Sequence, residues 1–148
     1  MIGISSGKKR LDMPSIKALT FDVFGTVTDW RSSVIRELSE LGRAKNIDAD
    51  WERFADLWRA GYGAGKERVR RSELPWANID TIHRMALDHL LAEFKIGGLN
   101  EGEKGDLNRV WHRLAPWPDA VSGLSRLRKK FVVATLSNGN VALLVNLA

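Results

Sequence analysis

Asp22 is the residue of this sequence that is best placed to do chemistry. It follows the run 16–21, whose β-favouring residues predict a buried strand, and it precedes a turn at Gly25-Thr26. Burying an ionised acid is costly unless hydrogen-bond donors hold it, and this turn can supply backbone N–H groups and the Thr26 hydroxyl. We therefore expect a carboxylate held at the mouth of a sheet, in position to attack a substrate.

A second apolar run, residues 131–136, ends in Ser137, Asn138 and Gly139. Active sites in parallel α/β sheets lie beyond the carboxyl ends of the strands, so Asp22 and Ser137 are expected to meet in one crevice. Taken alone, Asp22 would more often be a turn-forming or helix-capping acid. Its place after a strand and the second strand motif favour a nucleophile.

Residues 22–26, Asp-Val-Phe-Gly-Thr, resemble the first motif of the haloacid dehalogenase superfamily, whose nucleophile is the first aspartate of Asp-x-Asp-Gly-Thr. Residues 131–139 resemble the second motif, an apolar strand that ends in Ser or Thr. Together they are most similar to the type II 2-haloacid dehalogenases. The phosphatase branches carry a second aspartate where this sequence has Phe24, which can neither donate a proton nor organise a magnesium site. The resemblance therefore implies displacement of halide, with no metal and no cofactor.

The implied mechanism has two steps on a small 2-haloacid. The Asp22 carboxylate displaces the halide in line, and water then hydrolyses the resulting aspartyl ester. Arg59 lies in the setting Leu57-Trp58-Arg59, similar to the Trp-Arg setting of the type II enzymes, and is expected to hold the halide or the substrate carboxylate. A solvated helix-face arginine is the alternative, and Arg31 and Arg36 remain candidates for the same role.

Further contacts with substrate or halide are expected from residues near the two motifs. Ser137 is expected to donate to the substrate or to Asp22, and Asn138 either to donate to halide or to cap the next helix. Thr26 is expected to brace Asp22. The backbone N–H groups of Val23 and Phe24 are candidates for binding the substrate carboxylate. The Phe24 and Trp30 side chains are candidate pocket walls, although plain core packing is the commoner role of such aromatics.

The segment between the two strands has helical periodicity throughout. Helices are expected to begin at these places: Trp30 after an Asp29 cap, Trp51, Asn78 or Asp80, a capping box at Asn100 and Glu103, and Pro118. Gly61, Gly63 and Gly65 are expected to end the second of them, and Gly97-Gly98 the third. A last helix is expected from about Asn140.

This order predicts two parallel strands joined by a long helical crossover. The resemblance implies the corresponding α/β fold: a doubly wound parallel sheet core, incomplete here, with an inserted all-helical cap. The predicted boundaries are a flexible tail at 1–14, a core at 15–30 and 116–148, and a cap at 31–115. The lysine and acidic motifs of the family would follow residue 148. We therefore expect a C-terminally truncated form, in which the second step of catalysis is doubtful.

Composition limits the other functions. The sequence has 148 residues, 44% hydrophobic and 28% charged, with no cysteine, no signal-like start and no apolar run that could span a bilayer, which suits a cytoplasmic protein. The formal net charge is +5, densest at Arg68, Arg70 and Arg71, but no nucleic-acid motif accompanies it and no such partner is expected. A homodimer is possible.

The remaining aromatic residues are expected to be structural. Those on helix faces are assigned to the core of the cap (Trp51, Trp58 and Trp111), and the histidines are assigned to structural or solvated roles (His83, His89 and His112). Two other functions stay open: a magnesium-dependent phosphatase of the same superfamily, and a non-catalytic fragment acting as a basic interaction module.

Overall fold

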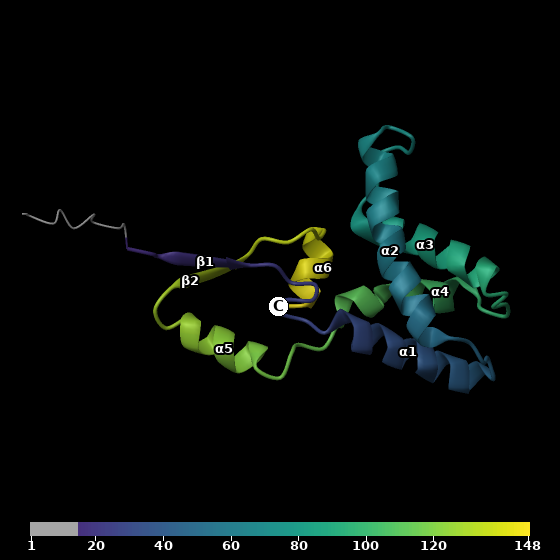
Figure 1. Ribbon diagram of the computed structural model, residues 1–148, viewed down its shortest axis with the longest axis horizontal. Coiled ribbons are helices and arrows are strands. Elements are labelled where there is room, and N and C mark those ends of the chain that lie inside the picture. Colours follow the sequence, from purple (N-terminus) through teal and green to yellow (C-terminus); the bar gives the residue numbers. More distant parts are fainter. Residues whose placement is uncertain (1–14) are drawn as a thin grey trace, which may run out of the picture.

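The computed structural model describes residues 15–148; the predicted tail at 1–14 lies outside the described residues. Two strands, β1 (Ala18–Phe21) and β2 (Val132–Thr135), form a sheet part with helix α5 (Ala120–Leu127). A helical part, residues 30–112, lies to one side of it (Figure 1). Helix α6 (Val141–Asn146) lies between the two parts (Figure 1).

The sheet part consists of two parallel strands. Strand β1 spans Ala18–Phe21 and β2 spans Val132–Thr135, in a register that pairs Ala18 with Val132 and Phe21 with Thr135. Parallel neighbours need a long crossover, and here the crossover contains the whole helical part. The predicted α/β class and the predicted parallel pair are confirmed.

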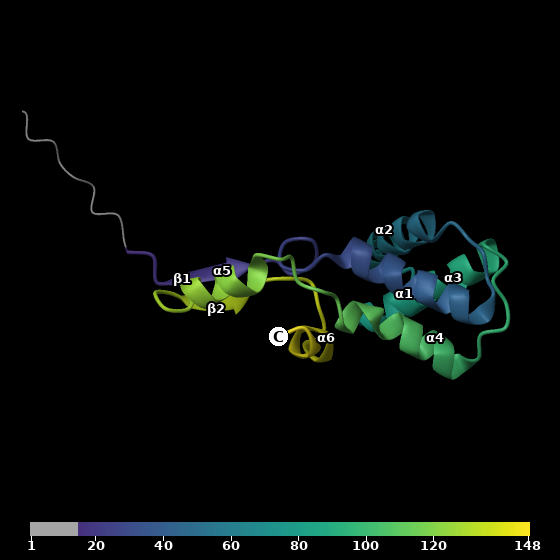
Figure 2. The same ribbon diagram turned by 90° about the horizontal axis from the view of Figure 1, so that it is seen from below.

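The prediction that these strands are buried is wrong for the described residues. Exposed and half-buried residues alternate along β1, and β2 has only one position that is even half-buried. Helix α5 (Ala120–Leu127) runs beside the two strands, as the view from below shows (Figure 2). It buries none of its own side chains completely, and Val132 of β2 remains 66% exposed. The sequence pattern predicted the two strands correctly. They stay exposed because two strands and one helix cannot cover both faces of a sheet.

The helical part is built from four α-helices and one short 3₁₀ helix. They are α1 (Trp30–Lys45), α2 (Trp51–Arg70), α3 (Ile79–Glu93), α4 (Glu101–Asn108) and η1 (Arg109–His112). Each α-helix begins with a side-chain cap, from Asp29, Asp50, Asn78 and Asn100 in turn. The capping box predicted at Asn100 and Glu103 is present. No helix within residues 15–148 combines the length and apolar character of a membrane span.

One continuous apolar core holds these helices together, and it includes a residue of α6 (Val141–Asn146). Its fully buried large side chains include Phe54 and Trp58 of α2, Leu87 of α3, Trp111 of η1 and Leu143 of α6. Phe54 and Trp58 pack edge to face at 6.2 Å between ring centroids, and Trp58 does so with Trp111 at 5.5 Å. Because Leu143 belongs to this core, α6 is docked on the helical part.

The three glycines predicted to end the second helix do not end it, because α2 continues through all of them to Arg70. A Cβ on Gly61 would lie 2.8 Å from the Cβ of Ala86, and one on Gly65 would lie 2.5 Å from Cγ2 of Ile82. Both contacts are with α3. Gly61 and Gly65 therefore let two helices approach closely, and this packing outweighs the low helix propensity of glycine.

This packing predicts opposite effects of alanine on one helix. Gly65→Ala and Gly61→Ala should each lower the free energy of unfolding by about 1–3 kcal/mol, because Ile82 and Ala86 are held in place by α3. A Cβ on Gly63 would have no atom within 4 Å. Gly63→Ala should therefore raise the free energy of unfolding by up to about 1 kcal/mol, because alanine has the higher helix propensity. Urea denaturation of the three variants measures this. A Gly65→Ala chain more stable than the unmodified protein would contradict the close packing.

The pair Gly97-Gly98 does not stop the third helix either. Helix α3 ends at Glu93, and Lys95 takes the left-handed conformation with φ of 56°. The helix that starts at the predicted capping box, α4, ends at Asn108. Residues 109–112 then tighten into η1, which buries Val110 and Trp111.

Two chain segments connect the sheet part to the helical part, and they are hydrogen-bonded to each other. The Asp29 N–H donates to the Ala115 carbonyl at 2.9 Å, and the Trp117 N–H donates to the Val27 carbonyl at 3.0 Å. The Trp117 indole N–H reaches the Gly25 carbonyl at 3.1 Å. Gly25 has φ of 94°, a conformation that permits the sharp turn directly after Asp22.

Candidate active site

Asp22 lies directly beyond the carboxyl end of β1 and is exposed. The Ser137 hydroxyl, beyond the end of β2, donates to Asp22 Oδ1 at 2.7 Å. The Thr26 hydroxyl donates to Oδ2 at the longer distance of 3.4 Å. The two strand ends therefore meet as predicted, and the carboxylate is oriented by side chains from two separate segments.

The Val23 N–H, a candidate for binding the substrate carboxylate, is hydrogen-bonded within the protein. The Val23 N–H donates to Ser137 Oγ at 3.3 Å, so it orients the serine that orients Asp22. The Val23 carbonyl accepts the N–H groups of Val27 and Thr28, both at 3.0 Å. Val23 itself is buried, which fixes this turn at the base of the site.

Asp22 opens into a pocket between the sheet part and the helical part. Its walls also include four other residues that the sequence singled out as candidates: Phe24, Arg59, Ser137 and Asn138. The cavity has a volume of about 50 Å³ and is partly open to solvent. Its wall combines one carboxylate and one guanidinium with mostly apolar and aromatic side chains, which is typical of a site for a small molecule.

Arg59 enters this pocket from α2 and is half-buried. Its guanidinium carbon lies 5.3 Å from the ring centre of Tyr62 and 5.9 Å from that of Trp30. Within residues 15–148 no carboxylate lies within ion-pair distance of it. A cation that is oriented by aromatic rings and lacks a protein anion is suited to bind an anionic ligand.

The other candidates for this cationic role lie elsewhere. Arg31 donates to Asp56 at 2.8 Å and to Glu52 at 3.1 Å, and these bonds raise the pKa of Arg31. Neither Arg31 nor Arg36 lines the pocket. Trp30 does not line it either; its ring stacks at 6.0 Å on Trp111, which does.

Four lining residues were missed as site residues, because the sequence assigned them to core or gave them no role: Tyr62, Ile79, His83 and Trp111. Arg59 and Tyr62 are three positions apart on α2, and Ile79 and His83 are four apart on α3. Helical periodicity therefore places each pair on one face. It does not show which face meets Asp22, because that depends on how the helices dock.

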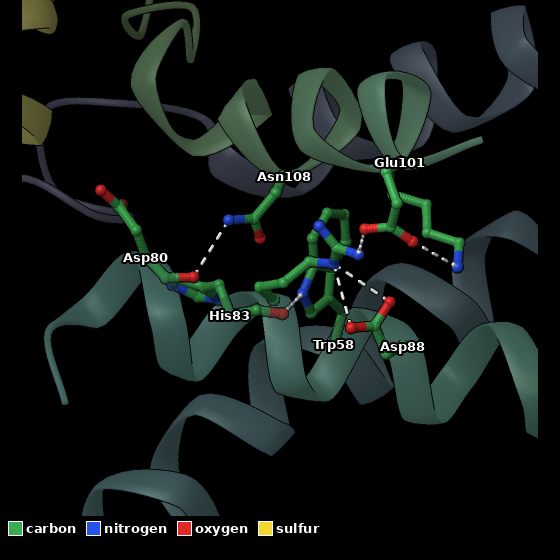
Figure 3. Close-up of polar contacts among 8 residues, drawn as sticks. Trp58, Asp80, His83, Asp88, Glu101 and Asn108 are labelled. Carbon is green, nitrogen blue, oxygen red and sulfur yellow. Dashed lines mark hydrogen bonds and ion pairs between the residues drawn. The ribbon is translucent and has the colours of Figure 1, made fainter. Parts of the chain in front are cut away.

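His83 is a buried, uncharged group in the pocket wall. It is 4% exposed, its ring stacks on Trp111 at 4.2 Å, and its carbonyl accepts the Trp58 indole N–H at 2.8 Å (Figure 3). Burial, helped by the nearby Arg59 charge, lowers the pKa of His83 to about 3. The ring is therefore neutral at physiological pH and gives the pocket an aromatic wall without a second positive charge.

This depressed pKa predicts a loss of stability in weak acid. The unfolded chain takes up a proton at His83 below pH about 6.5, while the folded chain does so only near pH 3, so stability falls as the pH drops between these values. Between pH 7 and pH 5, His83 should account for about 2 kcal/mol of this loss. Urea denaturation of His83→Phe at both pH values should show that contribution removed. The exposed His89 of α3 supplies the control, since His89→Phe should keep the full pH dependence.

The three arginines where the positive charge is densest each lie close to a glutamate. Arg70 and Arg71 both contact Glu67, at 2.7 and 2.6 Å, and Arg68 lies 3.8 Å from Glu73. These pairs reduce the local positive charge on which the alternative of a basic interaction module depends.

Known proteins match most of this chain. A family model described as a haloacid dehalogenase-like hydrolase matches residues 16–148. The chain belongs to this family. A curated member, (S)-2-haloacid dehalogenase 1 of a Pseudomonas species, is 30% identical, and the match covers 86% of this chain and 53% of that protein.

Solved structures of family members agree with the fold. A defluorinating L-2-haloacid dehalogenase superposes with a TM-score of 0.85 at 36% identity, covering 90% of this chain and 55% of that one. An L-2-haloacid dehalogenase from Xanthobacter autotrophicus with chloropropionic acid covalently bound gives a TM-score of 0.74 at 27% identity, covering 90% and 51%. The chain thus spans about half the length of the relatives it matches.

Proposed function

We propose that this protein acts as a hydrolytic dehalogenase on small 2-haloalkanoic acids, with Asp22 as the nucleophile. The observation that carries the proposal is the arrangement round one pocket: an exposed carboxylate, oriented by Ser137 at 2.7 Å, together with the half-buried Arg59. Relatives named as haloacid dehalogenases, one with chloropropionic acid covalently bound, support the same chemistry.

In the first step, an Asp22 oxygen attacks the carbon that bears the halogen. The new carbon–oxygen bond forms as the carbon–halogen bond breaks, and the halide leaves with the bonding electrons. The Ser137 hydroxyl holds one carboxylate oxygen and thereby aims the other. Substrate bound against the aromatic side chains of Phe24, Tyr62 and Trp111 would displace water from the reacting atoms, and this would strengthen the charge interactions there.

Arg59 is the proposed partner of the negative charge that develops on the halogen. Its guanidinium can also hold the carboxylate of the substrate, and the amide of Asn138 and the N–H of Phe24 add donors at the same pocket. Charge that develops on a departing halide is stabilised best by a cation already in place, and the cation–π contacts with Tyr62 and Trp30 help to hold the guanidinium in position.

In the second step, water attacks the carbonyl carbon of the aspartyl ester, which releases the 2-hydroxy acid and restores Asp22. A general base would assist this water. Among the described residues lining the pocket, Asp22 is the only carboxylate, and His83 with its pKa of about 3 is a weak base. We therefore expect ester formation to be faster than ester hydrolysis in this chain.

We propose two domains: residues 15–30 and 116–148 act as the catalytic core, and residues 31–115 act as the cap. Asp22 and Ser137 come from the sheet part, and Arg59 comes from the helical part that faces them. The pocket would then form only when the two parts are docked.

Halide release from each enantiomer of 2-chloropropionate by the purified protein tests the proposal. We expect release from one enantiomer, with a first turnover faster than later ones. Release of phosphate from an aryl phosphate in the presence of magnesium, without halide release, would contradict it. The side chain of Phe24 in the pocket wall, where the phosphatase branches carry aspartate, opposes that outcome.

A further inference from the structure

A polar network behind the pocket joins the helical part to the turn that carries Ser137 and Asn138. Asp80 Oδ1 lies 2.9 Å from His112 Nε2, and Asp80 Oδ2 accepts from the Asn140 amide at 2.8 Å. His112 Nδ1 lies 3.0 Å from the amide nitrogen of Asn146. We call these four residues the Asp80 network. They come from α3, from η1 and from both ends of α6, and Asp80 and Asn140 are 60 positions apart.

One assignment of donors and acceptors fits the three contacts of the network. The Asn146 amide nitrogen can only donate, so His112 Nδ1 accepts from it. The Nε2–H of His112 then donates to Asp80, which also accepts from the Asn140 amide.

The Asn140 side chain bonds to Asp80 and makes no capping bond to its own helix. It occupies the N-cap position of α6, where an asparagine oxygen normally accepts a backbone N–H and contributes about 1 kcal/mol. Here the side chain makes no capping bond, and its Oδ1 is buried without a partner. Its amide reaches across to Asp80 instead. The Asn140 side chain is therefore oriented by its bond to Asp80 and not by a capping bond at the start of α6.

The network lies directly beside residues of the pocket wall. Asp80 lies between Ile79 and His83 on α3, and His112 follows Trp111. Asn140 is two positions after Asn138 and three after Ser137. The Asn108 amide also donates to the Asp80 carbonyl at 3.0 Å and thereby fixes the first turn of α3 against α4 (Figure 3). The network therefore ties the turn at 137–140 to a rigid part of the molecule.

We propose that Asp80 is a positioning residue: by binding Asn140 and His112 it holds the Ser137–Asn138 turn in place over Asp22. Its catalytic consequence rests on the proposed function, because Ser137 orients the nucleophile. Its structural consequence, a fixed turn, does not depend on any reaction.

A charge swap tests this role. Asn140→Asp places two carboxylates at the 2.8 Å contact, which should raise backbone hydrogen exchange in residues 137–146 about tenfold. It should also slow ester formation about 10- to 100-fold with little change in KM. Adding Asp80→Asn restores an amide–carboxylate pair with the roles exchanged, and it should recover most of both losses. The matched control is Asp88→Asn, on the same helix, which removes only an exposed pair with Arg84.

Hydrogen exchange tests the positioning role of Asp80, and halide release tests the proposed function separately. Unchanged exchange in Asn140→Asp, or a double variant as impaired as the single one, would overturn the positioning role. If the unmodified protein releases no halide, the proposed function fails, while the exchange data still decide whether Asp80 holds the turn. The single variant Asp80→Ala, which removes the carboxylate without adding charge, should raise exchange in the same residues.

Discussion

Asp22→Asn should abolish halide release, with a fall in kcat of about a thousandfold or more. The amide keeps the size of the side chain and can still accept the Ser137 hydroxyl at the position of Oδ1. It cannot attack carbon, because its nitrogen lone pair is delocalised and its oxygen carries no full charge. Fold and pocket should persist, so the loss would belong to the chemistry.

The comparison is made by initial rates of chloride release from 2-chloropropionate, together with circular dichroism to show equal folding. Asp48→Asn is the matched control, since Asp48 is exposed in the turn after α1, outside the pocket. Equal rates for Asp22→Asn and the unmodified protein would remove Asp22 as the nucleophile.

Replacing Arg59 should give the second largest effect. Arg59→Leu should lower kcat/KM about 100- to 1,000-fold, the scale seen when one charge-stabilising donor is removed from a transition state. Arg59→Lys should recover only part of this loss. Lysine keeps the charge, but it lacks the planar group that lies over the rings of Tyr62 and Trp30 and that can donate two parallel hydrogen bonds.

Arg53 on the same helix provides the control. It is exposed and lies 4.0 Å from Glu93, and Arg53→Leu should change kcat/KM less than about twofold. The halide also supplies a signature. If Arg59 binds the leaving group, its loss should reduce inhibition by added chloride in parallel with the rate. Retained chloride inhibition together with a lost rate would place Arg59 on the substrate carboxylate instead.

Local signals in the sequence predicted the elements well. The apolar runs before Asp22 and Ser137 predicted two strands, and the capping residues Asp29 and Asn100 marked the starts of α1 and α4. These signals depend on neighbours within a few positions. The meeting of Asp22 with Ser137 also followed, because parallel strands bring their carboxyl ends to one edge.

Features that depend on how the helices pack against one another were not predictable from local signals. Gly61 and Gly65 looked like a helix end, because nothing in the sequence shows that α3 packs against them. His83 was predicted to be structural or solvated, yet it lines the pocket, because the docking of α3 and not a local pattern brings it there. His112 finds its partner Asp80 at a separation of 32 residues, beyond the reach of any local pattern.

The central claim is that Asp22 forms a covalent ester with the substrate. The direct test is to incubate the protein with 2-chloropropionate, quench it in acid within the first turnover, and measure peptide masses after digestion. We expect the added mass of a propionate ester on the peptide that contains Asp22, in amounts that match the chloride released, and none in Asp22→Asn. Chloride released without any label on that peptide would contradict the account.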